Sequence, residues 1–100
     1  MNGKYILDAG GNAVQEPDLL KWGRWFQTAD RHVANDIIGG VRVSTVFIGL
    51  DHNFGDGPPL IFETMVFGGP LDQEMKRYST REQAAAGHAV MIARVRASAA

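Results

Sequence analysis

The sequence predicts an α+β domain, a two-layer sandwich in which an antiparallel sheet of about three to five strands carries two amphipathic helices on one face. Two segments place apolar residues at helical spacing, and two others are rich in the β-branched residues that strands favour. The strand segments, 41–50 and 60–67, are separated only by residues 51–59. Because parallel strands need a connection of a dozen or more residues, these strands should be antiparallel neighbours. The 100 residues are close to the commonest domain size, so residues 1–100 should form a single domain.

The N-terminal third predicts a small hairpin followed by a helix. Residues 4–7 and 13–15 are expected to pair around a glycine-rich turn. Pro17 suits the first turn of a helix because its missing N–H costs nothing there, and Asp18 places negative charge at the positive end of the helix dipole. We expect this helix to continue to the Gly39–Gly40 pair, which should end it. Its apolar stripe has spacings of three and four and consists of Leu19, Trp22, Phe26, Ala29 and Val33.

The strand segments lead into a second helix. Residues 74–78 predict a further short strand at the edge of the sheet. A capping box then predicts the start of the helix, either from Ser79 with Glu82 or, one residue later, from Thr80 with Gln83. The helix is expected to run through the alanine-rich C-terminal region, and its apolar face consists of Ala84, His88, Met91 and Val95.

Composition excludes several classes of protein. Ten Lys and Arg face eleven Asp and Glu, so the basic excess of most nucleic-acid binders is missing and nucleic acid is not an expected partner. No apolar run approaches the ~20 residues of a bilayer span, and residues 1–7 lack the features of a signal peptide. We therefore expect a soluble cytoplasmic protein without membrane contact. Cysteine is absent, which excludes disulfides and thiolate chemistry and fits a reducing compartment.

The densest polar cluster is the connection between the two central strands, which contains Asp51, His52, Phe54 and Asp56. One interpretation is a general base formed by His52 and oriented by Asp51. The other is ordinary turn chemistry, because Asp, Asn, Gly and Pro build tight connections. Loops on rigid scaffolds often carry binding residues, so we expect a contact loop in which Phe54 is the apolar anchor.

Two further features could bind a partner. Trp25 lies beside the core stripe of the first helix, where it either joins the core or stays partly exposed as an anchor, because Trp is enriched at binding hot spots. Lys76 and Arg77 lie on the expected edge strand. Such a strand could accept an added strand from a partner, whereas the two charges could equally protect the edge from aggregation.

No motif assigns a catalytic residue, a metal or a cofactor. His32, His52 and His88 form no HxH or HxxxH pair, so no local metal-ligand spacing exists. The glycine pairs are not followed by Lys-Ser or Lys-Thr, and no GxSxG sequence is present. His88 on its apolar helix face is expected to be a core residue with a single hydrogen bond.

Several segments carry a resemblance that extends over almost the whole chain: 16–22 (EPDLLKW), 41–47 (VRVSTVF), 63–70 (ETMVFGGP), 77–80 (RYST), Glu82 and Gly87-His88. They resemble a set of small, uncharacterised phage and prophage proteins. The resemblance implies a gene expressed in the cytoplasm of a bacterial host cell and assigns no functional residue. It favours an inhibitor of a host system, including an anti-defence or anti-CRISPR protein, or a minor phage accessory factor.

Three functions therefore remain open. The leading one is non-enzymatic binding to a bacterial host protein, with a homodimer joined at an edge strand or a helix face as one arrangement. The second is a small enzyme or ligand-binding domain in which loop 51–57 acts with Glu63 or His88. The third is contact with nucleic acid through Arg81, Arg94 and Arg96.

Overall fold

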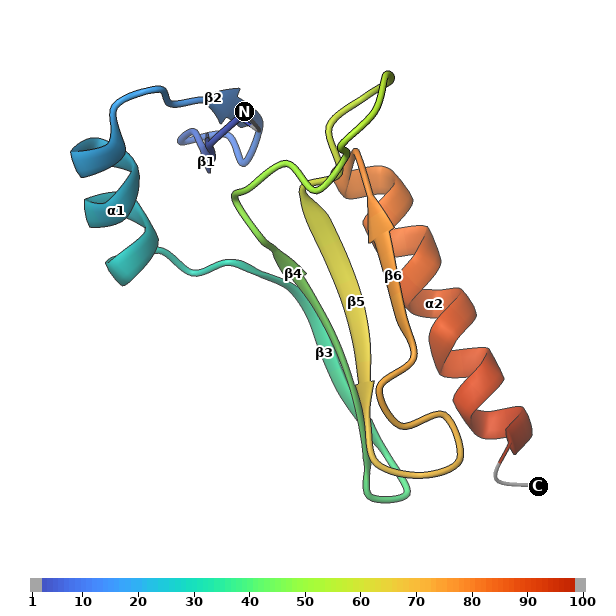
Figure 1. Cartoon of the computed structure of the whole chain (residues 1–100). Coiled ribbons are helices and arrows are strands. Elements are labelled where there is room, and N and C mark those ends of the chain that lie inside the picture. Colours follow the sequence, from blue (N-terminus) through green and yellow to red (C-terminus); the bar gives the residue numbers. More distant parts are fainter. Residues whose placement is uncertain (1–2, 99–100) are drawn as a thin grey trace.

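The structure, a computed structural model, describes residues 3–98. Its elements follow in the order β1 (Tyr5–Leu7), β2 (Ala13–Gln15), α1 (Leu19–Thr28), β3 (His32–Ile38), β4 (Val41–Phe47), β5 (Phe62–Phe67), β6 (Met75–Tyr78) and α2 (Arg81–Ser98). The strands form two antiparallel sheets, a β1–β2 hairpin and a four-stranded sheet in the order β3–β4–β5–β6 (Figure 1). The α+β class is therefore confirmed, and so is the antiparallel pairing of the two central strands.

One face of the four-stranded sheet is covered by α2. Alternate side chains of the central strands point to this helix, since Val43 and Val66 share a cluster with Met91, and Thr45 contacts His88. The buried residues of α2 are Ala84, His88, Met91 and Val95, the stripe that the sequence predicts. The helix begins at a capping box in which Gln83 N–H donates to Thr80 Oγ1 at 3.1 Å and Gln83 Oε1 accepts the Thr80 N–H at 3.2 Å. The box thus uses Thr80 and Gln83 rather than Ser79 and Glu82.

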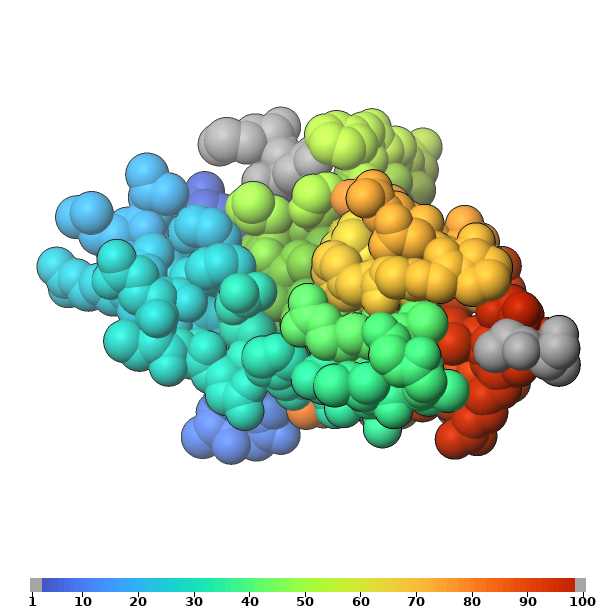
Figure 2. All heavy atoms as spheres, turned by 90° about the horizontal axis from the view of Figure 1, so that it is seen from below, coloured from blue at the N-terminus to red at the C-terminus, as the bar shows by residue number. Residues whose placement is uncertain are grey.

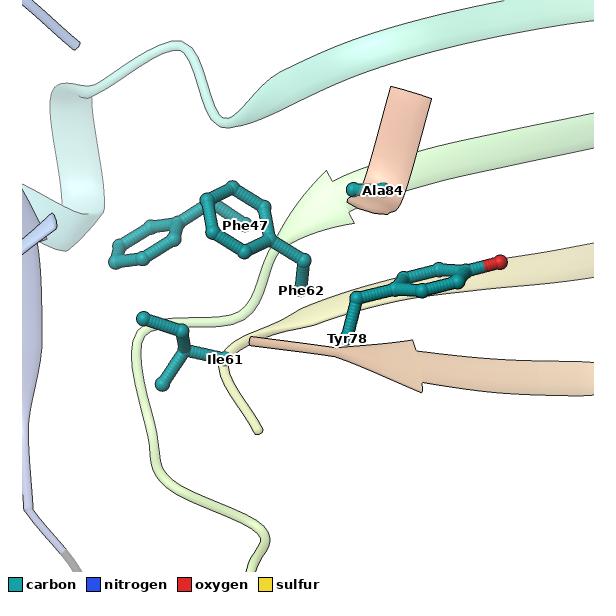
Figure 3. Packing of buried hydrophobic residues seen from close by; sticks show 5 residues of the cluster. All are labelled: Phe47, Ile61, Phe62, Tyr78 and Ala84. Carbon is teal, nitrogen blue, oxygen red and sulfur yellow. The ribbon is translucent and has the colours of Figure 1, made fainter. Parts of the chain in front are cut away.

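The largest buried cluster lies where the sheet meets the start of α2. It consists of Phe47, Ile61, Phe62, Tyr78 and Ala84 (Figure 3). The rings of Phe47 and Phe62 meet edge to face with centroids 5.2 Å apart, a favourable geometry for aromatic pairs. Gly87 lets α2 approach the ring of Tyr78, because a Cβ at this position would overlap the Tyr78 ring and hydroxyl. The spacing between the helix and β6 therefore depends on a glycine.

The N-terminal hairpin and α1 pack at one end of the sheet. The Tyr5 N–H donates to the Gly49 carbonyl at 2.8 Å, which ties β1 to the chain just beyond β4. Trp22 Nε1 donates to the carbonyls of both Tyr5 and Gly49 at 3.1 Å, so one indole joins α1 to this junction. Asp18 caps α1 by accepting the N–H of Leu20 at 3.0 Å. Because Asp18 is the N-cap, Pro17 precedes the helix instead of occupying its first turn.

The predicted length of the first helix is wrong. The helix ends at Thr28, and the following residues form the edge strand β3 instead of further helical turns. Gly39 and Gly40 do not end a helix. They adopt φ values of 54° and 84°, as the central residues of a type I′ turn do, and join β3 to β4 in a tight hairpin. Pairing with β4 outweighs the local helical pattern, which the β-branched Val33 and Ile37 support only weakly.

The expectation that both helices share one face of the sheet is not confirmed. The backbone of α1 lies close to β1 and reaches the larger sheet only through side chains such as Trp25, whereas α2 packs along all four strands of that sheet. The molecule is consequently elongated, 47 × 30 × 21 Å, with α1 and the C-terminal part of α2 at opposite ends of Figure 2. The sheet face opposite α2 is covered by no helix among residues 3–98.

Candidate functional site

The loop between β4 and β5 is closed at its base by one carboxylate. Asp51 Oδ1 accepts the N–H of Asn53 at 2.7 Å and the N–H of Leu60 at 2.9 Å, so it joins the two ends of the loop. The backbone N–H of His52 donates to the Leu60 carbonyl at 3.0 Å in the same region. These bonds fix the direction in which the loop leaves the sheet.

The tip of the loop is organised by Asn53. Its Nδ2 donates to the carbonyls of Asp56 and Pro58 at 3.1 and 2.9 Å, and its Oδ1 accepts the N–H of Gly55 at 2.9 Å. A single amide side chain therefore satisfies three backbone groups of the turn. The loop rises beyond the end of the sheet as the yellow-green excursion in Figure 1.

Phe54 projects from this loop. It is 84% exposed, the highest exposure of any large apolar side chain in the part of the chain that the structure describes. Because the neighbouring backbone is held by Asp51 and Asn53, the phenyl ring is presented on a preorganised support. Asp56, also exposed, lies two residues further along the loop.

The proposed general base does not form between Asp51 and His52. The Asp51 Oδ1 atom accepts backbone N–H groups, which is the turn chemistry expected as the alternative. The two groups suggested as partners of this loop also lie apart from each other. Glu63 Oε2 accepts from Arg77 Nε at 3.0 Å on the uncovered face, whereas His88 belongs to α2 and faces the opposite side of the sheet. The hydrogen bonds of Glu63 and His88 are thus with residues outside loop 51–57.

The remaining candidate residues lie elsewhere. Trp25 is half-buried, meets Phe47 edge to face at 5.7 Å and packs against the core cluster. Lys76 and Arg77 lie on β6, which is an edge strand as expected; Lys76 is exposed, and Arg77 is half-buried in its pair with Glu63. Of the helix cations, Arg94 donates from Nη2 to Glu74 Oε1 at 2.8 Å.

A chain of hydrogen-bonded side chains that the sequence did not predict links the sheet to α2, and it is buried except at its exposed end, Asp36. Thr64 Oγ1 and Thr45 Oγ1 are 2.5 Å apart, Thr45 Oγ1 is 2.7 Å from His88 Nδ1, and His88 Nε2 is 2.7 Å from Asp36 Oδ2. A hydroxyl, an imidazole and a carboxylate in line resemble a hydrolase triad. However, both threonines are fully buried, so a substrate cannot reach either hydroxyl.

The sequence did contain a signal for this series of hydrogen bonds. Strand alternation places Thr45 and Thr64 on the inward face with Val43 and Val66, opposite the helix stripe that contains His88. What the sequence could not supply was Asp36, because that residue lay in the region predicted to be helical. His88 is a core residue, as expected, but it is bonded at both ring nitrogens instead of one.

Within residues 3–98, no three His, Asp or Glu side chains are placed to hold a metal ion. None of the helices there is long and apolar enough to span a bilayer. Comparison of the chain with protein-family models, curated proteins and solved structures finds no match.

Proposed function

We propose that this chain is a non-enzymatic protein-binding domain whose contact surface is the 51–58 loop, with Phe54 as the apolar anchor. The observation that carries the proposal is the 84% exposure of Phe54 on a loop fixed by its own polar side chains. Burial of a large apolar side chain lowers the free energy by about 1.5–3 kcal/mol, and the Phe54 ring does not gain this stabilisation while it faces water. Aromatic side chains are enriched at protein interfaces, where this burial is recovered.

The internal bonds of the loop also favour binding. A flexible loop loses conformational entropy when a partner orders it, and this loss weakens binding. Here Asp51 and Asn53 already fix the backbone on both sides of Phe54. A partner that offers an apolar pocket for the ring, with a hydrogen-bond donor or a cation near Asp56, would match the loop.

The resemblance to phage and prophage proteins supports a bacterial host protein as the partner. In that setting, the domain acts in the host cytoplasm as an inhibitor of a host system, with anti-defence and anti-CRISPR roles in this class. Inhibition by occupancy requires a stable, specific contact and no catalytic group.

The test is affinity capture from bacterial lysates with the native chain and with Phe54→Ser. The native chain should retain a specific bacterial protein, and Phe54→Ser should weaken binding to the purified partner at least tenfold, as loss of an interface anchor does. Phe54→Trp should retain binding to the purified partner. Val90→Ser is the matched control, because Val90 is 61% exposed on α2, away from the loop.

Two results would contradict the proposal. One is a captured protein that binds Phe54→Ser as tightly as the native chain. The other is capture of nothing except the chain itself across several bacterial hosts.

A further inference from the structure

The sheet face opposite α2 has an unusual composition for a surface in water. Strand alternation and register place ten side chains on this open face: Asn35, Ile37, Arg42, Ser44, Val46, Glu63, Met65, Phe67, Met75 and Arg77. Half of them are apolar. The solvated face of an antiparallel sheet normally carries polar side chains in alternation with the buried ones. The open face therefore has the composition of a surface that another layer covers.

The exposed apolar groups are distributed across the whole sheet. Ile37 on β3 is 72% exposed, Met75 on β6 is 43% exposed, and Phe67 on β5 is 39% exposed. Met65 lies between them and is half-buried. Methionine side chains adapt their shape to a facing surface, and two of them occupy adjacent strands here, at the paired positions 65 and 75.

The charges on the open face are already satisfied within the chain. Arg77 Nε donates to Glu63 Oε2 at 3.0 Å. The Arg42 guanidinium lies 4.5 Å from the centroid of the Phe67 ring, a cation–π contact. A layer that covers this face therefore meets paired or stacked charges, which lowers the cost of removing water from them.

We propose that the open face binds a second copy of the chain, so that two sheets stack face to face with α2 on each outer side. The register makes the face self-complementary about a two-fold axis that runs parallel to the strands between β4 and β5. This axis places β4 over the partner's β5 and β3 over the partner's β6 while the rows of side chains stay aligned.

The middle row shows the complementarity. It reads Asn35, Ser44, Met65 and Met75 across the four strands. After the two-fold rotation, each methionine faces a shorter polar side chain: Met65 faces the partner's Ser44, and Met75 faces the partner's Asn35. Large groups facing small ones allow two layers to interdigitate.

The next row pairs cations with aromatic rings. It contains Arg42 and Phe67 on adjacent strands. The rotation places each Arg42 over the partner's Phe67, so a cation meets an aromatic ring and no two arginines face each other.

The area of the open face matches that of a weak dimer interface. Four strands about 4.8 Å apart and about six residues long, at about 3.3 Å per residue, give a face of roughly 400 Å² in projection. Two faces with the relief of their side chains bury about 1,000 Å², which is the threshold for a biological interface and the size of a weak, reversible one. We therefore expect a reversible dimer whose population rises with concentration.

The first experiment measures molar mass by sedimentation equilibrium over a concentration series. The native chain should approach twice the mass of one chain at high concentration. Met65→Lys and Ile37→Lys should each shift the mass to that of a single chain, and Val90→Lys on the outer face of α2 should not. Ile37 is the more exposed of the two, so Ile37→Lys is the variant to use if circular dichroism shows that Met65→Lys alters folding. A native chain that stays monomeric at all concentrations, or a dimer indifferent to both changes, would overturn the proposal.

The second experiment locates the interface. Because the chain has no cysteine, a single introduced thiol reports one position. A mixture of Asn35→Cys and Met75→Cys chains should be joined by a short bismaleimide, whereas either variant alone should not. Self-linking of Asn35→Cys would instead indicate pairing of two β3 edges and would refute face-to-face stacking. Phe54→Ser should remain dimeric, so failure of this inference and failure of the proposed function are distinguishable.

Discussion

His88 on α2 and Asp36 on β3, 52 residues apart in the chain, are joined by a 2.7 Å hydrogen bond between Nε2 and Oδ2. A carboxylate only accepts, so the network assigns the imidazole proton to Nε2. In the neutral ring, Nδ1 then accepts from the Thr45 hydroxyl, which can in turn accept from Thr64. This chain of bonds fixes the helix to the edge strand and to the two central strands at once.

Thr45 and Thr64 should contribute unequally to the stability of the protein. Thr45→Val leaves His88 Nδ1 and the Thr64 hydroxyl unpaired in a buried site, which should lower the free energy of unfolding by about 1–3 kcal/mol. Thr64→Val leaves the bond from Thr45 to His88 intact and should cost less than about 1 kcal/mol. Urea denaturation measures both, with Thr45→Ser as the control that retains the hydroxyl. Equal losses for the two valine variants would contradict this reading of the bond directions.

The two helical glycines should respond to alanine in opposite directions. At Gly23 in α1, an added Cβ meets no atom within 4 Å, so Gly23→Ala should stabilise the protein by about 0.5–1 kcal/mol through helix propensity. At Gly87 in α2, the Cβ would overlap the buried ring of Tyr78, so Gly87→Ala should destabilise it by about 1–3 kcal/mol. Thermal unfolding followed by circular dichroism checks both signs. Stabilisation by Gly87→Ala would mean that α2 does not approach β6 this closely.

Variants of Asn53 and Phe54 should distinguish the side chain that holds the loop backbone from the side chain that faces water. Asn53→Ala removes the side chain that holds three backbone groups, so hydrogen exchange at the Gly55 N–H should become faster. Phe54→Ala should leave this exchange rate unchanged. It should also leave the free energy of unfolding within about 0.5 kcal/mol of the native value, because the ring faces water. Protection that is unchanged by Asn53→Ala would show that the loop is not preorganised by that side chain.

The carboxylate of Asp30 should titrate below its ordinary pKa. The backbone N–H of His32 donates to it, its side chain pairs with the His32 ring, and together these contacts lower its pKa from 3.8. A depressed pKa means that the stabilising contribution is present above the ordinary value and is lost as the pH falls through the lowered one. The effect on stability should be small, because Asp30 is exposed. An NMR titration of the Asp30 side chain measures it, and a pKa at or above 3.8 would contradict the pairing.

Local sequence signals located most elements because their causes are local. The α2 stripe, its alternative capping box at Thr80, the β4–β5 pairing and the edge strand β6 all follow from periodicity, caps and loop length. The polar connection between β4 and β5 was also indicated by its composition, and its Phe54 is exposed. No local signal could show that Asn53 would organise the tip, because amide bonding to the backbone depends on the fold of the turn.

The segment 29–38 shows where local signals fail. Ala29 and Val33 continue the helical spacing of α1, yet Ala29 is extended and Val33 lies in β3. The gain from pairing six residues of β3 with β4 exceeds their weak helical preference, and only the folded sheet supplies that partner. Because this segment was predicted to be helical, Asp36 could not be placed beside His88, and the hydrogen bonds that join them were not predicted.

The order of the residues determined what each segment could do alone: where helices begin, which strand faces are apolar, and which loop is polar with a phenylalanine at its tip. The tertiary structure decided which faces meet. Within residues 3–98, it placed α1 on β1, left one side of the four-stranded sheet without a covering helix, and joined Thr64, Thr45, His88 and Asp36 by hydrogen bonds. The physical reason is that periodicity and capping act over a few residues, whereas burial and pairing energies depend on contacts between segments that are distant in the chain.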